Sequence, residues 1–343
     1  MNHDIFYDKA FGAFAGLILG DAVGMPVEFL TPEMIKKEYG KISTLVSVKK
    51  FHPHRGLKFG SITDDSEQAL YLAEEMIKDK ALTYETVKRS LLRWVKEKDA
   101  FNKSYIGPSS KKALIRLKNG EDYLNTGNEG NTIGATMRVV PVGIIRAGNI
   151  KKAIDDAVIS SYPTHSVSKA IAGATSLAAA ISECFNQRAT AKTIIDAAIY
   201  GAKIGQTKGL QYCSSSVWQR IVYAINLIKE VKSTKKVAEL LYNIIGTDMF
   251  SEQIIPVIFS LFYKYSQEFS KAFWISVNLG GDTDTIAGLL GSVYGAFYGF
   301  SRFPSKEKNL FNKISEINNL QVGKTVKGLW EIKQIEKDGK NGG

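Results

Sequence analysis

The chain has 343 residues, enough for one large domain or two ordinary ones with a sizeable core. An apolar fraction of 44% and a charged fraction of 23% exclude general disorder. The net charge of +11 comes from lysines spread along the whole chain without interleaved aromatic residues. We therefore expect solvated helix faces and no nucleic-acid partner.

The sequence gives few signs of export. Two cysteines, Cys184 and Cys213, cannot form a disulfide framework, which favours a reducing compartment. The first residues lack a basic region followed by an apolar run. The longest apolar run, 286–300, is shorter than the roughly 20 residues that a membrane-spanning helix needs. We expect a cytoplasmic monomer with no membrane contact.

Apolar residues recur at helical spacing through most of the chain, which predicts an all-α fold, a compact orthogonal multi-helix bundle. Weak alternation at 42–48 and 326–335 is the only strand signal. No linker divides the chain, so we expect one helical domain at 1–325 and a short C-terminal appendage with a polar tail at 326–343. The predicted helices are 11–24, 66–77, 84–96, 109–119, 135–147, 151–161, 166–185, 191–203, 217–231, 235–245, 253–263, 269–277 and 285–299.

Two predicted helices, one near each end of the chain, carry a glycine at every fourth position. The first ladder is Gly12, Gly16, Gly20 and Gly24, and the second is Gly291, Gly295 and Gly299. Glycine in a helix costs roughly 1 kcal/mol relative to alanine, so this many glycines imply a packing reason. A glycine-lined face lets another helix approach closely, and such packing could bring the two ends of the sequence together.

The first acidic segment is Thr63-Asp64-Asp65, directly before a predicted helix. A helix cap explains one of these residues, but not the two adjacent carboxylates. Neighbouring carboxylates repel each other unless a cation lies between them.

The second acidic segment carries Asp282 and Asp284 and ends in Thr285, again before a predicted helix. A preceding glycine pair permits a tight turn, so both carboxylates can face one centre. Carboxylate and hydroxyl oxygens suit magnesium, manganese or calcium. Together the two segments have enough ligands to bridge two ions roughly 3.5–4 Å apart, an arrangement that also occurs in phosphohydrolases.

Three further segments have both a functional and a structural interpretation. Glu28 follows the end of the first glycine-bearing helix, where it is either a surface residue or a site carboxylate. The glycine-rich loop 127–134 is either a phosphate-binding loop or a plain helix start. His165, at the start of the helix 166–185, is either a structural residue or a site residue.

In this order, the five segments resemble the ADP-ribosylglycohydrolase family, which includes the dinitrogenase reductase-activating glycohydrolase and the arginine- and serine-directed ADP-ribosyl hydrolases. The sequence departs from the family pattern at Ser66, where threonine is usual, and at Ile133, where asparagine is usual. Ile133 lies in the glycine-rich loop that would face the substrate, so this loop is altered. The matching motifs are G-D-x-x-G-x-x-x-E at 20–28, T-D-D at 63–65, a glycine-rich loop ending in M-R at 138, T-H at 164–165 and G-G-D-x-D-T at 280–285.

The resemblance implies an all-helical bundle with two magnesium or manganese ions in a central cleft. It implies Glu28 as a catalytic carboxylate, with Asp65 and Asp284 as metal-linked aspartates that share this role. The implied metal ligands are Thr63, Asp64, Asp65, Asp282, Asp284 and Thr285. The implied substrate-binding residues are Gly127, Asn128, Gly130, Gly134, Met137 and His165.

The resemblance predicts hydrolysis of ADP-ribose from a modified protein, such as an ADP-ribosylated arginine, or from a small molecule. Cleavage would occur at the anomeric carbon of the distal ribose through an oxocarbenium-like transition state. Two alternatives remain from the sequence: a two-metal phosphohydrolase, and an ADP-ribose-binding protein without catalysis, for which the altered loop at Ile133 leaves room.

Overall fold

The computed structural model describes residues 2–341, with side chains as far as Ile335, and this part of the chain is all-α. It contains no strand, only one isolated bridge between Val167 and Leu210. The all-α prediction is confirmed. The helices are α1 (His3–Gly24), α2 (Pro32–Tyr39), α3 (Asp64–Asp79), α4 (Tyr84–Lys98), α5 (Pro108–Lys118), α6 (Tyr123–Thr126), α7 (Val140–Ile145), α8 (Ile150–Ser161), α9 (Ser168–Cys184), α10 (Ala191–Gly205), α11 (Val217–Ile228), α12 (Thr234–Leu240), α13 (Ser251–Lys264), α14 (Phe269–Val277), α15 (Thr283–Tyr298), α16 (Ser305–Ile317) and α17 (Val322–Asn341).

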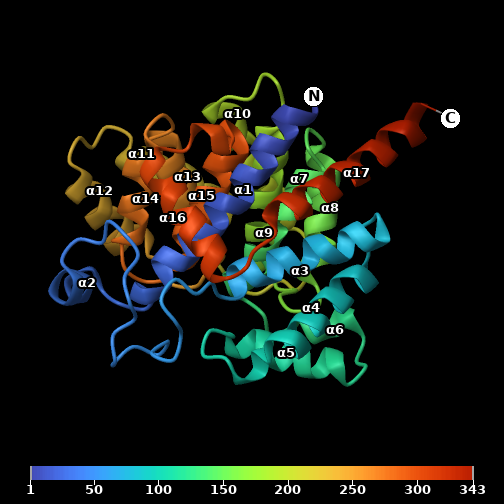
Figure 1. Ribbon diagram of the computed structural model, residues 1–343, viewed down its shortest axis with the longest axis horizontal. Helices are drawn as coiled ribbons and strands as arrows, with labels where there is room; N and C mark the ends of the chain where they lie inside the picture. The colour runs from blue at the N-terminus through green and yellow to red at the C-terminus, as the bar shows by residue number, and fades with distance from the viewer. Residues whose placement is uncertain (1, 342–343) are drawn as a thin grey trace.

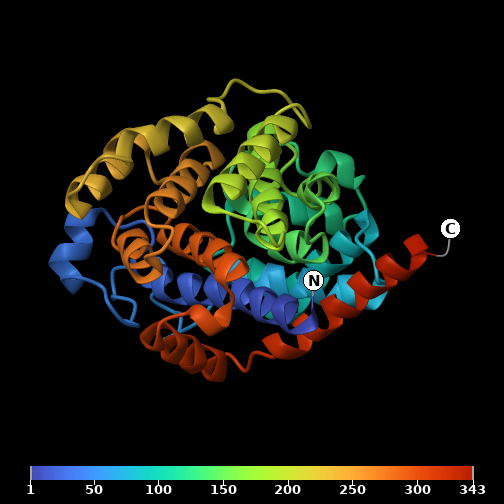
Figure 2. The ribbon, with the colours of Figure 1, turned by 90° about the horizontal axis from the view of Figure 1, so that it is seen from above.

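The two glycine-bearing helices, α1 and α15, pack against each other at the centre of the molecule (Figures 1 and 2). A Cβ atom at Gly16 would lie 2.0 Å from the carbonyl oxygen of Gly291, so only a hydrogen fits between the backbones. A Cβ atom at Gly20 would meet the backbone of Gly288 at 2.1 Å. The ladders therefore make the close packing possible, and it brings the two ends of the chain together.

Other helices pack against different sides of this pair (Figure 2). On one side α9 lies buried among α8, α10 and α13, and apart from Lys169 all its residues are buried. On the other side α16 and α17 cover α1. Because α9 also contacts α15, one continuous apolar core connects these helices with the central pair.

The helices α2, α16 and α17 lie outside the predicted helices, and two further stretches differ from the predicted elements. The predicted helix 135–147 is two 3₁₀ turns, Ile133–Ala135 and Met137–Val139, followed by the short α7. Pro141 explains the break, because a proline is tolerated in the first turn of a helix but not in its interior. The stretch 42–48 is an irregular loop, and the side-chain amide of Asn278 satisfies both the N–H and the carbonyl of Ile42.

The C-terminal helix α17 crosses the predicted domain boundary at 325/326 without a break. Val326, Leu329 and Ile332 are buried in the common core, which explains the apolar spacing at 326–335. Among the described helices, α1 with the turn that follows it, His3–Val27, is the one long and apolar enough to cross a membrane. However, 94% of its most apolar window is buried inside the protein.

Candidate active site

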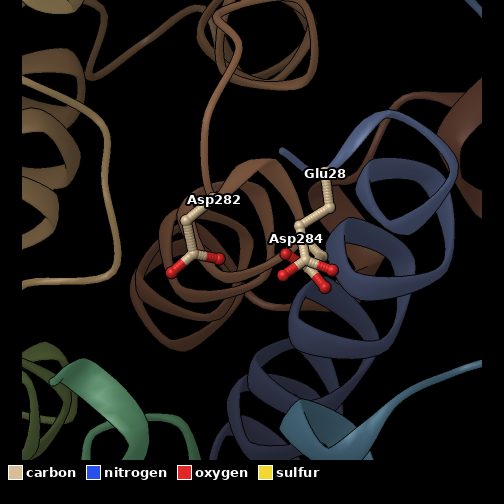
Figure 3. A group of neighbouring side chains, drawn as sticks. All are labelled: Glu28, Asp282 and Asp284. Atoms are coloured by element: carbon tan, nitrogen blue, oxygen red, sulfur yellow. The ribbon is translucent and has the colours of Figure 1, made fainter. Parts of the chain in front are cut away.

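The close packing of α1 and α15 brings three carboxylates together where α1 ends and α15 begins. Glu28 follows α1 after one 3₁₀ turn, and Asp282 and Asp284 lie at the start of α15. One carboxylate oxygen from each lies within 4.8 Å of the other two, and Figure 3 shows Glu28 pointing towards Asp284. This spacing is suited to a shared cation.

Backbone hydrogen bonds fix these two segments to each other. The Phe29 N–H donates to the Gly281 carbonyl at 2.8 Å, and the Gly281 N–H donates to the Leu30 carbonyl at 3.0 Å. Gly280 and Gly281 both have positive φ, 83° and 81°, which an L side chain rarely adopts. The glycine pair therefore shapes the turn that places Asp282 opposite Glu28.

Asp21, inside α1, holds the start of α3 in place. Its carboxylate accepts the Thr63 N–H at 3.0 Å, the Thr63 hydroxyl at 2.9 Å and the Ser66 N–H at 3.1 Å. A carboxylate from another helix thus caps α3, because it satisfies N–H groups that no residue within α3 can pair. This bracing positions Asp64 and Asp65 beside the carboxylates of α15.

The site concentrates buried negative charge. Burial, reinforced by the charge of Glu28, raises the pKa of Asp64 and of Asp284 well above the usual aspartate range. Burial and the neighbouring charges of Asp21 and Asp64 raise the pKa of Asp65 in the same way. Burial also raises the pKa of Asp21 to about 6, although its hydrogen bonds partly offset the shift. Such a cluster is stable in ionised form only with positive charge nearby.

The chain itself supplies little of that positive charge. Within the described residues, no lysine or arginine forms an ion pair with the site carboxylates. Asp65 Oδ2 is buried and has no hydrogen-bond partner. The buried Arg138, whose charge interacts with that of Asp64, donates its hydrogen bonds to Gln68, Thr164 and backbone carbonyls. The donor set of carboxylate and threonine oxygens therefore fits a hard divalent cation.

Two histidines of the loop between α2 and α3 hold Glu28. His54 Nε2 lies 2.6 Å from Glu28 Oε2, and the Ser104 hydroxyl is 2.9 Å from His54 Nδ1. The His54 backbone N–H donates to His52 Nδ1, so His52 carries its proton on Nε2, which donates to the Glu28 carbonyl at 2.6 Å. Burial lowers the pKa of His54 to about 4, so this ring is neutral at pH 7.

The glycines of the loop 127–134 have a packing role. Cβ atoms at Gly127 and Gly130 would lie 2.2 and 2.0 Å from the carbonyl oxygens of Tyr162 and Thr164. The loop does not open a long helix, because 3₁₀ turns follow it. Ile133 is buried in the core, and its N–H donates to the Met249 carbonyl at 2.8 Å.

The other predicted substrate residues differ in exposure. His165 is fully buried, with its ring against Gly134 and hydrogen bonds to the hydroxyls of Thr132 and Thr164. Met137 is also buried. Asn128 is half-buried, and its side-chain oxygen accepts the Ser166 hydroxyl at 2.9 Å. Substrate contact by His165 and by this loop stays a prediction.

Three residues of the site were missed by sequence reasoning. Asp21 lies in the first glycine-bearing helix, where its place within G-D-x-x-G was the available signal. His54 lies in a loop without periodicity, and the His52-Pro53-His54 sequence was its only signal. Arg138 ends the glycine-rich loop motif, and this position was its available signal. Its charge lies close enough to Asp64 to interact with it.

A cavity of about 460 Å³ leads to the acidic cluster. Its lining residues include Asp282, Gly281, Asp248, Met249 and Phe29. Thr285 is buried beside Asp284, whose carboxylate accepts the Thr285 N–H at 3.0 Å. A solvated ligand in this cavity can thus contact Asp282.

Comparisons with known proteins found related sequences. The sequence matches the ADP-ribosylglycohydrolase family over residues 2–331. It is 29% identical to the uncharacterized protein YegU of Escherichia coli (strain K12) over 95% of this chain and 98% of that protein. It is 25% identical to the ADP-ribosylarginine hydrolase Tri1 of Serratia proteamaculans (strain 568) over 91% of this chain and 78% of that protein.

A solved structure described as an ADP-ribosylglycohydrolase-related protein complex has the same fold. The TM-score is 0.67 at 22% identity, and the match covers 96% of this chain and 99% of the other. The resemblance found in the five sequence segments is confirmed, and the match supports ADP-ribosyl hydrolase activity. The chain belongs to the ADP-ribosylglycohydrolase family.

Proposed function

We propose that this protein releases ADP-ribose from a modified arginine side chain of a target protein, in the cytoplasm and as a monomer. The observation that carries the proposal is the buried cluster of Glu28, Asp282 and Asp284, adjoined by Asp64 and Asp65. The similarity to an ADP-ribosylarginine hydrolase supports arginine as the linkage. One buried and one exposed free cysteine, Cys184 and Cys213, are compatible with a reducing compartment.

We propose that two divalent cations, magnesium or manganese, bind between the two acidic segments. Their ligands would be Thr63, Asp64, Asp65, Asp282, Asp284 and Thr285, all of which are buried. When bound, such cations supply Lewis-acid polarisation of water and of ribose hydroxyls. The unpartnered Oδ2 of Asp65 supports this assignment.

Glu28 would act as the general base. The water oxygen forms a bond to the anomeric carbon of the distal ribose, the carbon–nitrogen bond to the guanidine breaks, and Glu28 accepts the proton from the water. Without bound cations, burial and the charge of Asp282 raise the pKa of Glu28. His54 holds the carboxylate through Oε2.

The negative charge of the site suits the transition state. An oxocarbenium-like ribose carries developing positive charge, which nearby carboxylates stabilise. Asp65 and Asp284 would share this role with Glu28, since each of the two lies close enough to shift the pKa of a neighbouring carboxyl group. The departing guanidine takes up a proton from solvent after the bond has broken.

The test is product analysis with arginine-linked and serine-linked ADP-ribosylated proteins, with magnesium, with manganese and with chelator. Release of free ADP-ribose with an intact diphosphate from the arginine-linked protein supports the proposal. Cleavage of the diphosphate would instead indicate a phosphohydrolase. Thermal stabilisation by ADP-ribose without any turnover would indicate a binding protein.

A further inference from the structure

Three neighbouring cavities share lining residues in sequence, and Asp282 of the acidic cluster lines the first of them; we call the three together the trough. The first, of about 460 Å³, contains Asp282 and shares Tyr242 and Asn243 with a second cavity of about 380 Å³. The second shares Lys36 and Asn278, among others, with a third cavity of about 770 Å³. The trough passes between α2 and α12, which lie side by side at one end of the molecule (Figures 1 and 2).

The third cavity has a basic rim and an apolar floor. Five lysines and no acidic residue line it. Its floor includes Ile35, which is 1% exposed, and the half-buried Ile275. An apolar floor with charges of one sign at the rim is typical of a binding surface for a segment of opposite charge. The rim lysines are Lys36, Lys41, Lys235, Lys271 and Lys306.

Three of these lysines form no ion pair with any described side chain. Lys271 is paired with Glu268 at 2.9 Å, and Lys235 lies 3.9 Å from Glu239. Lys36, Lys41 and Lys306 are exposed and form no ion pair with any described side chain. Their positive charge is therefore uncompensated within the described residues.

We propose that this trough binds an acidic segment of the target protein next to its ADP-ribosylated residue. The proposal rests on the proposed function, because it assumes that the ADP-ribosylated side chain enters the site at Asp282. The apolar floor takes an apolar side chain of the segment, and Lys36, Lys41 and Lys306 pair with its carboxylates. The lysine-rich cavity would thereby select which modified proteins are hydrolysed.

The floor is less suited to a nucleic acid. Single-stranded nucleic acids bind by stacking bases on exposed aromatic rings. The Trp274 ring is not free for this, because Lys306 Nζ lies 4.6 Å from its centroid and its N–H donates to Glu307. No second aromatic residue lines the third cavity.

The test compares the triple variant Lys36→Glu/Lys41→Glu/Lys306→Glu with a charge-matched control, Lys96→Glu/Lys151→Glu/Lys208→Glu. The control lysines are exposed, and none lines a cavity of the trough. Substrates are free ADP-ribosylarginine and two ADP-ribosylarginine peptides of equal length, one with flanking Asp and Glu and one with Asn and Gln in their place.

The expected result is that wild type and control prefer the acidic peptide by about tenfold in kcat/KM at low ionic strength, through KM. The triple variant loses this preference and keeps its rate on free ADP-ribosylarginine. No preference in the wild type, or an equal preference in the triple variant, would overturn the proposal. So would RNA displacing the acidic peptide from the wild type more effectively than a polyglutamate of equal charge.

Direct binding separates this proposal from the proposed function. Fluorescence anisotropy of the unmodified acidic peptide measures the trough without any hydrolysis. Binding that is lost in the triple variant and retained in the control supports the trough, even if no ADP-ribosylated substrate is cleaved. Hydrolysis of free ADP-ribosylarginine without peptide binding would leave the proposed function intact and would overturn the proposal that the trough binds an acidic segment.

Discussion

His54 Nε2 and Glu28 Oε2 lie 2.6 Å apart in the buried wall of the acidic site. The neutral ring fixes the orientation of the carboxylate, and His52 fixes the backbone of the same residue through its carbonyl. Glu28 is thus held by two residues of one loop, in the way that hydrogen-bonded neighbours orient site ligands.

We expect His54→Ala to lower kcat by about 10- to 100-fold with little change in KM, because the Glu28 side chain loses its orientation. Steady-state kinetics of ADP-ribose release measures this. The matched control is His3→Ala, since His3 is exposed at the start of α1 and remote from Glu28. A normal kcat in the His54 variant would show that the hydrogen bond does not position the base.

Glu28→Gln should lower kcat by about 10²- to 10⁴-fold, because the amide keeps the shape of the side chain but cannot accept a proton from water. Stabilisation of the folded protein by magnesium should remain, since the proposed ligands are unchanged. Glu85→Gln, at an exposed position in the first turn of α4, is the control. Near-normal turnover of the Glu28 variant with intact magnesium binding would rule out Glu28 as the base.

Gly16→Ala should destabilise the protein by about 3 kcal/mol, measured as the free energy of unfolding in denaturant. Alanine is the better helix former by roughly 1 kcal/mol, but its Cβ would lie 2.0 Å from the Gly291 carbonyl oxygen, so the clash dominates. Gly56→Ala is the control, because nothing lies within 4 Å of its Cβ position. Equal stability of the two variants would contradict the close packing of α1 and α15.

Metal-free protein should lose stability as the pH rises from about 4 to 7. The folded-state pKa of Asp21 is raised to about 6, above the unfolded value of roughly 3.9, so the folded state binds more protons in this window. The loss from Asp21 alone is on the order of 3 kcal/mol. Melting temperatures with chelator and with magnesium, measured across this range, give the metal-dependent part of the slope.

Magnesium should therefore raise the melting temperature more at pH 8 than at pH 5, because protons and cations compete for the same carboxylates. Titrating groups remote from the site contribute equally to the melting temperatures with chelator and with magnesium. Their contributions therefore cancel in the difference between the two curves. An equal magnesium effect at both pH values would argue against cation binding by these carboxylates.

The fold was largely predictable, because helical periodicity survives wherever a helix has one apolar face. The glycine ladders also predicted that the two ends of the chain meet, since the backbones at Gly16 and Gly291 approach too closely for any side chain. Pro141 marked the break in the predicted helix 135–147, but only tertiary packing decided that 3₁₀ turns precede it. The apolar residues of 326–335 did not reveal that α17 packs on the core.

The candidate site was predictable only in part. Asp282 and Asp284 share a turn with a glycine pair, so their proximity followed from local sequence. His54 reaches Glu28 across 26 residues of chain through a loop with no periodic pattern, so no local signal connected the two. The glycines at 127 and 130 matched a phosphate-binding pattern, although the structure gives them a packing reason against the segment 162–165.

The most direct test of the central claim is the rate of ADP-ribose release from an arginine-linked ADP-ribosylated protein by wild type and by Asp284→Ala. Each is measured with magnesium or manganese and with chelator, and circular dichroism checks that the variant is folded. The account predicts release by the wild type only with added metal, and a loss of at least about 100-fold in folded Asp284→Ala. Undiminished release with chelator, or by Asp284→Ala, would contradict it.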